Sequence, residues 1–306
     1  MNISLRDISY FLAVAGTARL SQAAELCGVT QPALSKAMLR LEGELGLKLL
    51  ERHARGTRMT AAGQQFLPMA QNLHAGDLDA QRLAGELRAR GAGLLRIGVT
   101  NATRTGLLAP VLGELIQQRA GLRVQLRIGR SDQLAKSVQA GELDLALVPA
   151  YSDTTFSCEH TVIGRDPLLP VVRADHPLAR LTHPKLKDLQ PFSWLLASST
   201  STPFRLLNGL YRSCSLPAPT VVVETDYASE IDLTLLRSTN LLALVPQSMM
   251  SLNEQSDLHV LPISELKLER EVVMLNRTGV ATPLMRTLQE RVSKHAMQMD
   301  KSRAKR

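Results

Sequence analysis

Residues 20–63 read LSQAAELCGVTQPALSKAMLRLEGELGLKLLERHARGTRMTAAG, and this stretch decides the fold of the first part of the chain. Apolar residues recur at helical spacing before and after Gly28, and a glycine here suits a tight turn between two helices. A short apolar hairpin around Leu49 follows, and then a long helix. This order is typical of a winged helix-turn-helix, which presents one helix to a DNA major groove. The stretch therefore predicts binding to double-stranded DNA.

The residues around this stretch predict where its helices begin and what they bury. Ser4 and Asp7 fit a capping box at the start of a first helix. Thr30 is the expected N-cap of the third helix, and Pro32 is tolerated in its first turn. The residues expected to point into the core are Ile8, Phe11, Leu12, Ala15, Ala23, Ala24, Leu26, Leu34, Met38, Leu41 and Leu45.

Polar residues fall off the apolar stripe of the third helix and are candidate DNA contacts. They are Gln31, Ser35, Lys36 and Arg40. Glutamine can pair with an adenine edge, serine can contact a base or a phosphate, and the free amides of the helix start suit a phosphate. A solvated polar face would show the same pattern. Arg52, Arg55 and Arg58 then follow at three-residue spacing, which suits a loop that contacts phosphates or a narrow minor groove.

The whole run closely resembles the N-terminal winged helix-turn-helix of LysR-type transcriptional regulators. The matching elements are Phe11, Ala23-Ala24, Gln31-Pro32-Ala33-Leu34-Ser35, Leu41-Glu42, Leu45-Gly46, Leu49-Leu50, Arg52, Arg55 and Thr60-Ala61-Ala62-Gly63. Leu50 stands where the family usually has Phe, and Met59 where it usually has Leu; both keep an apolar plug. The resemblance implies a sequence-specific regulator rather than an enzyme.

The same resemblance implies roles for individual residues. Gln31, Pro32 and Ser35 would approach base edges, and Arg52 and Arg55 would contact DNA beside the wing. Thr30 and Lys36 would then be phosphate contacts. Arg40 completes the set of expected DNA-binding residues.

Residues 61–90 carry apolar residues at roughly helical spacing, interrupted by Pro68 and Gly76. Such a helix cannot bury its apolar side alone. By resemblance it is the antiparallel dimerisation helix; the alternative is a helix packed on its own chain. The glycine-containing run 88–93 suits a hinge. We therefore expect a DNA-binding domain at 1–60, a linker helix at 61–90 and an effector-binding domain at 91–300.

From Leu94 onward short strands alternate with helices, which predicts an α/β domain with a parallel sheet. The expected strands are 95–99, 124–128, 143–148, 194–197, 221–223, 241–245 and 271–275, and the last helix is 282–297. The pattern resembles the two-lobed effector domain of the same family, akin to periplasmic binding proteins. The phrases that carry the likeness are Gly141-Glu142-Leu143-Asp144-Leu145-Ala146, His176-Pro177-Leu178-Ala179 and Leu244-Val245-Pro246. Lobe I is expected at about 94–165 and 269–300, and lobe II at 166–268.

Ligands of open parallel sheets bind at the carboxyl ends of the strands, which predicts an effector site between the lobes. One lip would be Thr100, Asn101, Ala102 and Thr103. The opposite lip would be Ser198, Ser199, Thr200, Ser201 and Thr202, leading into a helix near Phe204. A hydroxyl-rich loop that enters a helix N-terminus suits a carboxylate, although a plain N-cap loop would look the same. Asp226 and Tyr227 could supply a third wall, with Asp226 equally suited to cap a helix.

Composition sets the remaining expectations. The 306 residues carry a net charge of +8, which suggests a polyanionic partner. The three cysteines are far apart, so we expect neither a disulfide framework nor a metal site. The first nine residues lack the apolar run of a signal peptide, and no stretch predicts a membrane-spanning helix. A cytoplasmic protein with no membrane partner is expected.

Enzyme motifs are missing: there is no Gly-x-Ser-x-Gly elbow, His-Glu-x-x-His pair or phosphate-binding glycine loop, so no catalytic residue and no cofactor is expected. A pure solute-binding protein would lack residues 1–90, and a nucleoid-type protein would bind DNA without an effector. The favoured hypothesis is a LysR-type regulator that binds a DNA operator as a homodimer or homotetramer. Its effector would be a small molecule, with an organic acid as the guess from the family, and RNA polymerase would be a further partner.

Overall fold

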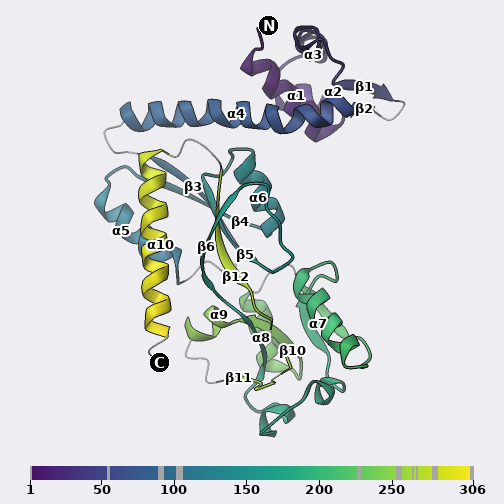
Figure 1. The fold of residues 1–306 in the computed structure, drawn as a ribbon, viewed down its shortest axis with the longest axis vertical. Helices are drawn as coiled ribbons and strands as arrows, with labels where there is room; N and C mark the ends of the chain where they lie inside the picture. Colours follow the sequence, from purple (N-terminus) through teal and green to yellow (C-terminus); the bar gives the residue numbers. More distant parts are fainter. Residues whose placement is uncertain are drawn as a thin grey trace.

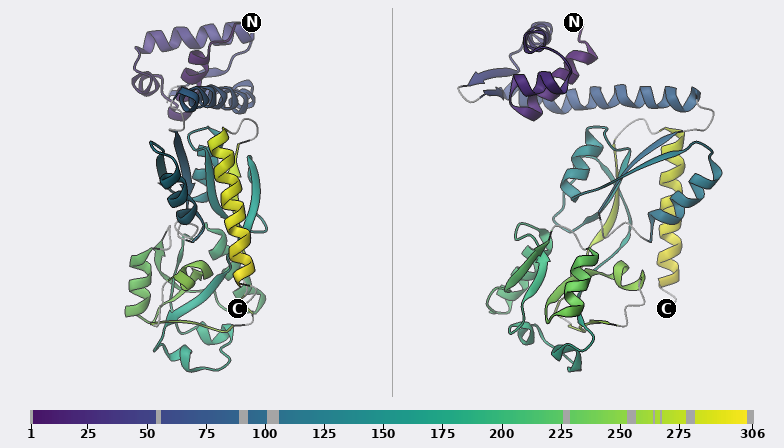
Figure 2. Two further views of the ribbon diagram at one scale, coloured as in Figure 1. Left: turned by 90° about the vertical axis from the view of Figure 1, so that its left-hand side faces the viewer. Right: turned by 180° about the vertical axis from the view of Figure 1, so that it is seen from behind.

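The computed structural model describes residues 2–53, 56–88, 93–100, 106–225, 229–252, 257–263, 265–266, 268–277 and 282–303. Three parts follow one another along the chain (Figure 1). A small head (residues 2–60) leads into a long linker helix, α4 (Ala61–Arg88), which lies across the top of a two-lobed α/β body. The two turned views in Figure 2 show the same separation of the head from the body by α4.

The head contains three helices, α1 (Leu5–Thr17), α2 (Leu20–Leu26) and α3 (Gln31–Leu45), at the positions predicted from the sequence. Their core is one cluster that includes Ile8, Phe11, Val14, Ala23, Ala24, Leu34, Ala37, Met38 and Leu41. Gly28 has a φ of +64°, so the turn between α2 and α3 uses the left-handed conformation that glycine adopts without strain. The Thr30 hydroxyl accepts a hydrogen bond from the Ala33 amide and caps α3, as predicted.

Two details of the head differ from expectation. Ser4 is the N-cap of α1, but its hydroxyl accepts from the Arg6 amide, and buried Asp7 accepts two hydrogen bonds from Arg40 instead of completing a capping box. A charged guanidinium is a stronger partner for a buried carboxylate than a backbone amide. Leu26 is 74% exposed rather than buried, because α2 ends at this residue and turns away from the core.

The wing is a two-stranded hairpin, β1 (Leu50–His53) and β2 (Gly56–Met59), that Glu42 of α3 holds in place. Glu42 accepts hydrogen bonds from the amides of Leu49 (2.9 Å) and Leu50 (3.1 Å) and from Lys48 Nζ (2.7 Å). Gly63, at the start of α4, approaches the same segment so closely that a Cβ would lie 2.1 Å from the Leu49 carbonyl oxygen. The structure thus explains two residues of the sequence motif: Glu42 holds the wing, and only glycine fits at position 63.

The linker helix α4 packs on its own head at one end and exposes apolar residues beyond it. Phe66 lies 5.5 Å from Phe11 between ring centroids, and Ala70 is fully buried in the head core. Met69, Leu73 and Leu87 are 46–72% exposed. The helix continues through Pro68 and Gly76, where the sequence indicated interruptions. The helix therefore packs on its own chain at the head, and dimerisation through its exposed apolar residues stays a prediction.

Lobe I is a five-stranded sheet in the order β4-β3-β5-β12-β6, with helices α5 (Leu108–Gln118), α6 (Ser131–Gln139) and α10 (Pro283–Arg303). Its strands are β3 (Leu94–Val99), β4 (Arg123–Ile128), β5 (Leu145–Ala150), β6 (Glu159–Arg165) and β12 (Glu271–Asn276). The first three are parallel, as predicted, but β12 runs antiparallel to both β5 and β6. The sheet is mixed because β12 enters from the other lobe, at the opposite end.

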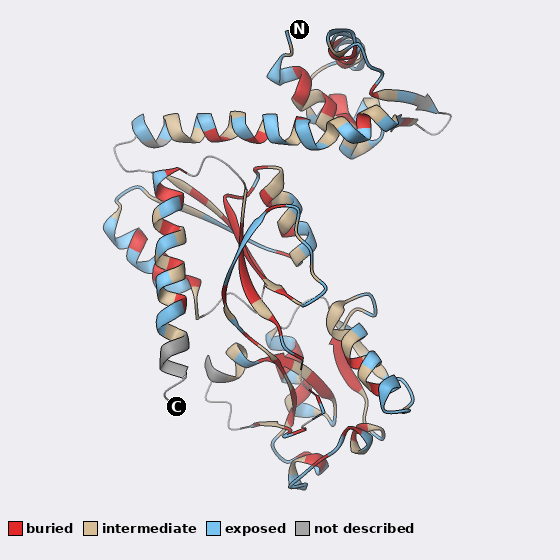
Figure 3. Ribbon diagram, in the orientation of Figure 1, coloured by how far each residue is buried: buried red, intermediate tan, exposed pale blue. Residues whose placement is uncertain are grey.

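Lobe II is a second five-stranded sheet in the order β11-β7-β10-β8-β9. Its strands are β7 (Leu168–Arg173), β8 (Trp194–Ala197), β9 (Val221–Thr225), β10 (Leu242–Pro246) and β11 (Leu258–Val260). Helices α7 (Thr202–Ser213), α8 (Glu230–Ser238) and α9 (Gln247–Leu252) and two 3-10 turns, η2 (Pro177–Arg180) and η3 (Leu186–Leu189), complete the lobe. Strands β8, β9 and β10 are parallel, whereas β7 and β11 are antiparallel to their neighbours. Figure 3 shows the buried residues concentrated in the two sheets.

The phrase His176-Pro177-Leu178-Ala179 forms the start of η2, with His176 and Leu178 buried. His176 is fully buried; its Nδ1 accepts from the Leu178 amide at 3.1 Å, and its Nε2 lies 3.3 Å from the Asn240 carbonyl oxygen. Burial lowers the pKa of His176, so the ring is neutral and donates from Nε2. The histidine caps η2 and ties it to the loop before β10.

Two adjacent segments, 165–168 and 268–271, carry the chain between the lobes. They are paired by backbone hydrogen bonds from the Asp166 amide to the Arg270 carbonyl (3.0 Å) and from the Leu168 amide to the Leu268 carbonyl (3.0 Å). A pair of short crossing strands is the simplest hinge for two lobes that move as units.

Glu42→Gln is expected to destabilise the head by about 1–3 kcal/mol at neutral pH, because charge-assisted bonds to the wing are weakened. Burial opposes ionisation of Glu42, but the bonds from Lys48 and from the Leu50 and Leu49 amides outweigh it and lower its pKa. A lowered carboxyl pKa stabilises the fold above the unfolded pKa, and this stabilisation is lost as the pH falls through the folded value. Hydrogen exchange of the Leu49 and Leu50 amides between pH 7 and pH 4 measures it, with exposed Glu25→Gln as control. Equal protection in Glu42→Gln and wild type would contradict the role of Glu42.

Candidate functional site

The predicted DNA contacts of the head lie on the outer face of α3. Thr30, Gln31, Pro32, Lys36 and Arg40 are exposed, and Ser35 is half-buried. The buried residues of α3 alternate with them and face α1 and α2. The first two turns of the helix therefore offer amide, hydroxyl and ammonium groups to a partner.

Arg40 also forms an ion pair with Asp7 within the head. It donates from Nε (2.8 Å) and Nη2 (2.5 Å) to the buried carboxylate of Asp7, while its own side chain remains 55% exposed. Hydrogen bonding to Asp7 raises the pKa of Arg40 further. The guanidinium is consequently held in one orientation at the surface, where its remaining N–H groups point outward from the pair.

The wing lies beside α2 and is fastened to the loop before it. The Thr57 amide donates to the Ala18 carbonyl at 2.9 Å, and Gly56 passes this carbonyl so closely that a Cβ would lie 2.6 Å from its oxygen. Arg52 belongs to β1, opposite Thr57, and Arg58 is exposed on β2. Arg55 and Ala54 lie outside the described residues.

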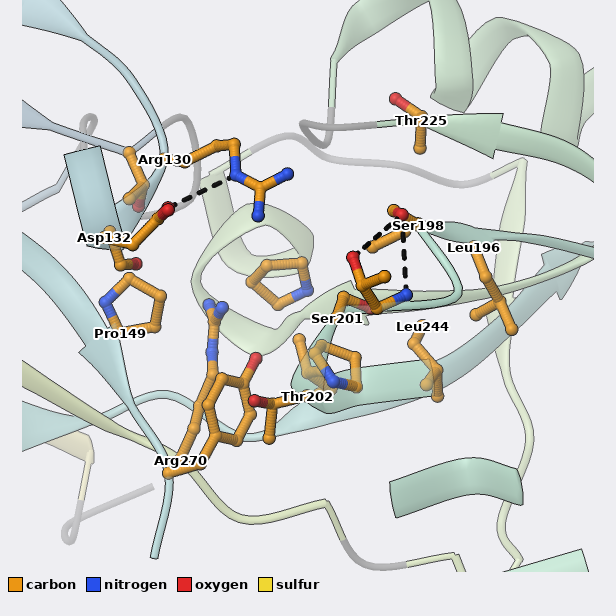
Figure 4. A pocket seen from close by; sticks show the side chains of 18 of the residues that line it. Arg130, Asp132, Pro149, Leu196, Ser198, Ser201, Thr202, Thr225, Leu244 and Arg270 are labelled. Carbon is orange, nitrogen blue, oxygen red and sulfur yellow. Dashed lines mark hydrogen bonds and ion pairs between the residues drawn. The ribbon is translucent and has the colours of Figure 1, made fainter. Parts of the chain in front are cut away.

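A cavity of about 620 Å³ lies between the two lobes, at the carboxyl ends of their parallel strands. Figure 4 shows Arg130, Asp132 and Pro149 of lobe I opposite Ser198, Ser201, Thr202 and Leu244 of lobe II. The apolar part of its wall includes Pro149, Phe156, Leu195, Leu196, Leu244 and Val245. A volume of this size suits a small organic molecule.

Two helix N-termini from opposite lobes open into this cavity. Ser131 begins α6 and Thr202 begins α7, and both residues line the wall. Ser201 caps α7, with its hydroxyl accepting from the Phe204 amide at 3.3 Å, and Ser198 Oγ lies 3.2 Å from Thr200 Oγ1. The plain N-cap interpretation of this loop is therefore correct for Ser201, and the loop lines a cavity as well. Helix N-termini and hydroxyls together favour an anionic group.

Arg270, which lines the cavity, belongs to a buried ion pair at the hinge. Arg270 donates from Nη2 to Asp166 Oδ2 (2.5 Å) and from Nε to the Asp166 carbonyl (2.6 Å), and both side chains are about 96% buried. Asp166 also accepts from the Ser248 amide (2.7 Å) and hydroxyl (2.9 Å). Burial raises the pKa of Tyr151, which also lines the cavity, and the nearby Arg270 opposes that rise.

The rim of the cleft carries weaker, exposed pairs. Arg130 Nε lies 3.2 Å from Asp132 Oδ1. Arg205 of α7 reaches Asp153 of lobe I at 2.9 Å and so connects the lobes, but both side chains are at least half exposed. Exposed pairs of this kind contribute little stability.

The structure brings some predicted effector residues to the cavity and not others. Thr100, Ser198, Thr200, Ser201 and Thr202 line it. Ser199 is exposed outside the wall, and Phe204 packs against the core of lobe II because it lies on the inner side of α7. Asn101, Ala102, Thr103, Asp226 and Tyr227 lie outside the described residues.

The sequence interpretation missed residues that the fold brings to the cavity. Ser131 and Arg130 follow β4 just as Thr100 follows β3, so the rule that located Thr100 could have found them. Tyr151 follows the parallel strand β5 in the same way, whereas Arg270 had no such signal. Arg270 lies at the hinge before an antiparallel strand, and only the return of the chain from lobe II places it under the cavity.

The described residues contain no group of three His, Cys, Asp or Glu side chains that could hold a metal ion. Over the same part of the chain, no helix combines the length and apolar character needed to cross a bilayer. Cys27, Cys158 and Cys214 are free thiols.

A winged helix-turn-helix joined by one helix to a two-lobed ligand cleft defines a class of one-component transcriptional regulators, and the comparisons give its family. Residues 5–64 match the family described as "Bacterial regulatory helix-turn-helix protein, lysR family", and residues 88–297 match the "LysR substrate binding domain". The chain belongs to the LysR family of transcriptional regulators. The family consists of regulators rather than enzymes, as expected from the sequence.

Individual relatives share about a third of the aligned residues with this chain. The regulator GbpR of Azospirillum brasilense is 30% identical over 73% of this chain and 66% of its own length. The uncharacterised regulator YnfL of Escherichia coli K12 is 34% identical over 63% and 65%. The match thus spans slightly less than two thirds of either relative.

Solved structures share the fold over nearly the whole chain. A full-length variant of OxyR from Pseudomonas aeruginosa has a TM-score of 0.61 at 21% identity, covering 96% of this chain and 98% of its own. Full-length CbnR complexed with its target DNA has a TM-score of 0.52 at 22% identity, covering 96% and 99%.

Arg270→Met should destabilise the body by about 3–5 kcal/mol, because the substitution leaves the Asp166 carboxylate buried without its cation. The matched variant Arg205→Met breaks an exposed pair and should cost less than about 1 kcal/mol. Trp194, the single tryptophan, is fully buried in lobe II, so its fluorescence during urea unfolding measures both. Similar losses of unfolding free energy in the two variants would contradict the stabilising role of the Arg270–Asp166 pair.

Proposed function

We propose that this chain binds a DNA operator through α3 and the wing, and that a small organic acid in the cleft between the lobes controls this binding. The observation that carries the proposal is the coexistence of an exposed polar face on α3 with a sizeable cavity walled by two helix N-termini. The domain limits 1–60, 61–90 and 91–300 are part of the same proposal.

For the DNA contacts, we assign Gln31, Pro32 and Ser35 to base edges, and Thr30 and Lys36 to phosphates. Arg40 presents a guanidinium that Asp7 keeps oriented, which suits a phosphate or a guanine edge. Arg52 and Arg55 belong to the wing contact with flanking DNA. The structural neighbour CbnR, crystallised with its target DNA, has the same fold over almost its whole length.

For the effector, the wall chemistry favours an acid with an apolar body. The N-termini of α6 and α7 and the hydroxyls of Ser131, Ser201 and Thr202 suit a carboxylate, and the leucine and proline walls suit a hydrocarbon skeleton. Arg270 is already neutralised by Asp166, so the carboxylate is assigned to the helix N-termini rather than to this arginine.

For assembly, the free apolar residues of α4 support pairing with a second copy. Met69, Leu73 and Leu87 are exposed on a helix that packs on the head through Phe66, Leu67 and Ala70. We infer a homodimer or homotetramer that brings two heads to one palindromic operator. Contact with RNA polymerase and a cytoplasmic location complete the proposal for a protein that acts on chromosomal DNA.

Ser35→Glu should abolish operator binding, a loss of at least about 100-fold, because a carboxylate replaces a hydroxyl where phosphates and base edges approach. The matched control Ser213→Glu makes the same change at an exposed position at the end of α7 and should leave affinity unchanged. An electrophoretic mobility shift with the intergenic DNA upstream of the gene measures both. Retained binding by Ser35→Glu would sink the assignment of α3 as the recognition helix.

A carboxylate that binds the cleft should raise the melting temperature of the wild-type protein, since a ligand at 100 times its Kd stabilises by about 2.7 kcal/mol. Leu244→Trp fills the cavity and should remove the shift, whereas Val222→Trp, an exposed position of the same lobe, should keep it. A panel of small aliphatic and aromatic carboxylates in a thermal-shift assay is the measurement. Shifts produced only by cations or neutral sugars would overturn the acid assignment.

A further inference from the structure

The C-terminal half of the linker helix is fastened to lobe I by a compact group of residues. We call it the linker joint: Ala75, Asp79 and Arg82 of α4, with Gly141, Asp144 and Arg277 of lobe I. Arg82 Nη1 donates to Asp144 Oδ1 at 2.7 Å and lies 3.4 Å from Asp79 Oδ1. Arg82 also donates to the Gly141 carbonyl oxygen, and Arg277 forms an ion pair with Asp79.

The charges of the linker joint are balanced and largely removed from water. Asp144 and Asp79 are 2% and 9% exposed, and Arg82 and Arg277 are 13% and 16% exposed. Burial raises the pKa of Asp144, and the positive charge of Arg82 opposes this rise. Removing one arginine of the linker joint would leave a carboxylate buried without its cation, which is far more costly than breaking a surface pair.

The backbones also touch at the linker joint. Gly141 has a φ of +73°, and a Cβ at this position would lie 2.8 Å from the Cβ of Ala75. Ala75 itself is fully buried. The pair of small residues thus lets α4 lie directly on the loop that follows α6, and any larger side chain on either partner would force the two apart.

Three elements of lobe I connect the linker joint to the cleft. Strand β5 begins directly after Asp144, contains cleft-lining Pro149 and is followed by cleft-lining Tyr151. Strand β12 lies between Arg270, which lines the cleft, and Arg277. Helix α6 begins at the cleft with Ser131 and ends just before the loop that carries Gly141. Each element spans the roughly 14–20 Å between the two places as one rigid segment. Figure 1 shows β5, β12 and α6 extending from α4 toward lobe II.

Asp144 adds a hydrogen bond that fixes the sheet at its upper end. Its Oδ2 accepts from the Arg96 amide of β3 at 2.6 Å, while its own amide donates to the Arg96 carbonyl at 2.7 Å. Strand β3 then leads to Thr100 in the cleft wall. One carboxylate therefore links α4 with two neighbouring strands.

We propose that the linker joint is the device by which a rearrangement at the cleft reaches the DNA-binding head: lobe I and α4 of one chain move as a single body. The transmission part of this proposal rests on the proposed function, whereas the fixed attachment of α4 to lobe I stands independently of it. A ligand that changes the angle between the lobes about the hinge changes the position of α4. The head moves with α4 because Phe66 and Ala70 of this helix pack in the head core.

The attachment is tested without ligand or DNA. Spin labels at exposed Gln81 of α4 and exposed Glu290 of α10, in a full-length Cys27→Ser, Cys214→Ser background, report their distance by double electron–electron resonance. Dilution with unlabelled protein isolates the distance within one chain. We expect a narrow distribution that broadens at least about twofold in Arg82→Gln, Arg277→Gln and the wedge variant Ala75→Leu. Arg291→Gln, which removes an arginine from α10 away from α4, is the matched control.

Ala75→Leu, the wedge variant, tests the attachment without removing a charge. We expect it to fold even if the arginine variants do not, because leucine is a strong helix former. Circular dichroism checks that each variant retains its structure. Distributions that stay narrow in all three variants would overturn the attachment.

Transmission is then measured on DNA. The same variants and the control are footprinted on the intergenic operator fragment, and the bend of the fragment is measured by end-to-end energy transfer. The proposal expects a shifted footprint or a changed bend in the three joint variants and no change in Arg291→Gln. Broadened distances with an unchanged footprint and bend would overturn transmission. If the wild-type protein binds no DNA, the proposed function fails, and the resonance distances still decide the attachment.

Discussion

The hydrogen-bonded ion pair between Arg82 and Asp144 is the contact that makes the head, the linker helix and the body one structure. The pair is almost fully buried and joins a helix to the base of a central strand, so that α4 has a defined place on lobe I. At its other end α4 completes the head core with Ala70. The position of the head relative to the cleft therefore depends on a single helix that is held at both ends.

The hinge is built on the same physical principle. Arg270 and Asp166 lie on the two segments that cross between the lobes, and each satisfies a charge that would be costly to bury alone. In both pairs the carboxylate also accepts hydrogen bonds from other groups, Ser248 for Asp166 and the Arg96 amide for Asp144, so each carboxylate is held by several donors. The pair under the cleft and the pair on the linker helix thus mark the two ends of lobe I, and β12 connects them directly through Arg270 and Arg277.

The local elements could be predicted because their causes are local. Gly28 permits the turn, Thr30 caps α3, and the alternation of strands and helices predicts two α/β lobes. Predictions failed where a distant partner changed a local preference. Asp7 fits a capping box but binds Arg40, 33 positions away, and the expected parallel sheet of lobe I is mixed because β12 returns from the opposite lobe.

The sequence by itself determined the class of the protein: the spacing of the head motif is specific, and the family comparisons agree with it. It also located Thr100 and the 198–202 loop, because both follow strands and strand ends are readable from periodicity. Only the tertiary structure decided that Arg270 lines the cleft and that Asp79, Arg82, Asp144 and Arg277 meet. These residues are up to 198 positions apart, and burial of opposite charges is a property of the folded arrangement rather than of any segment.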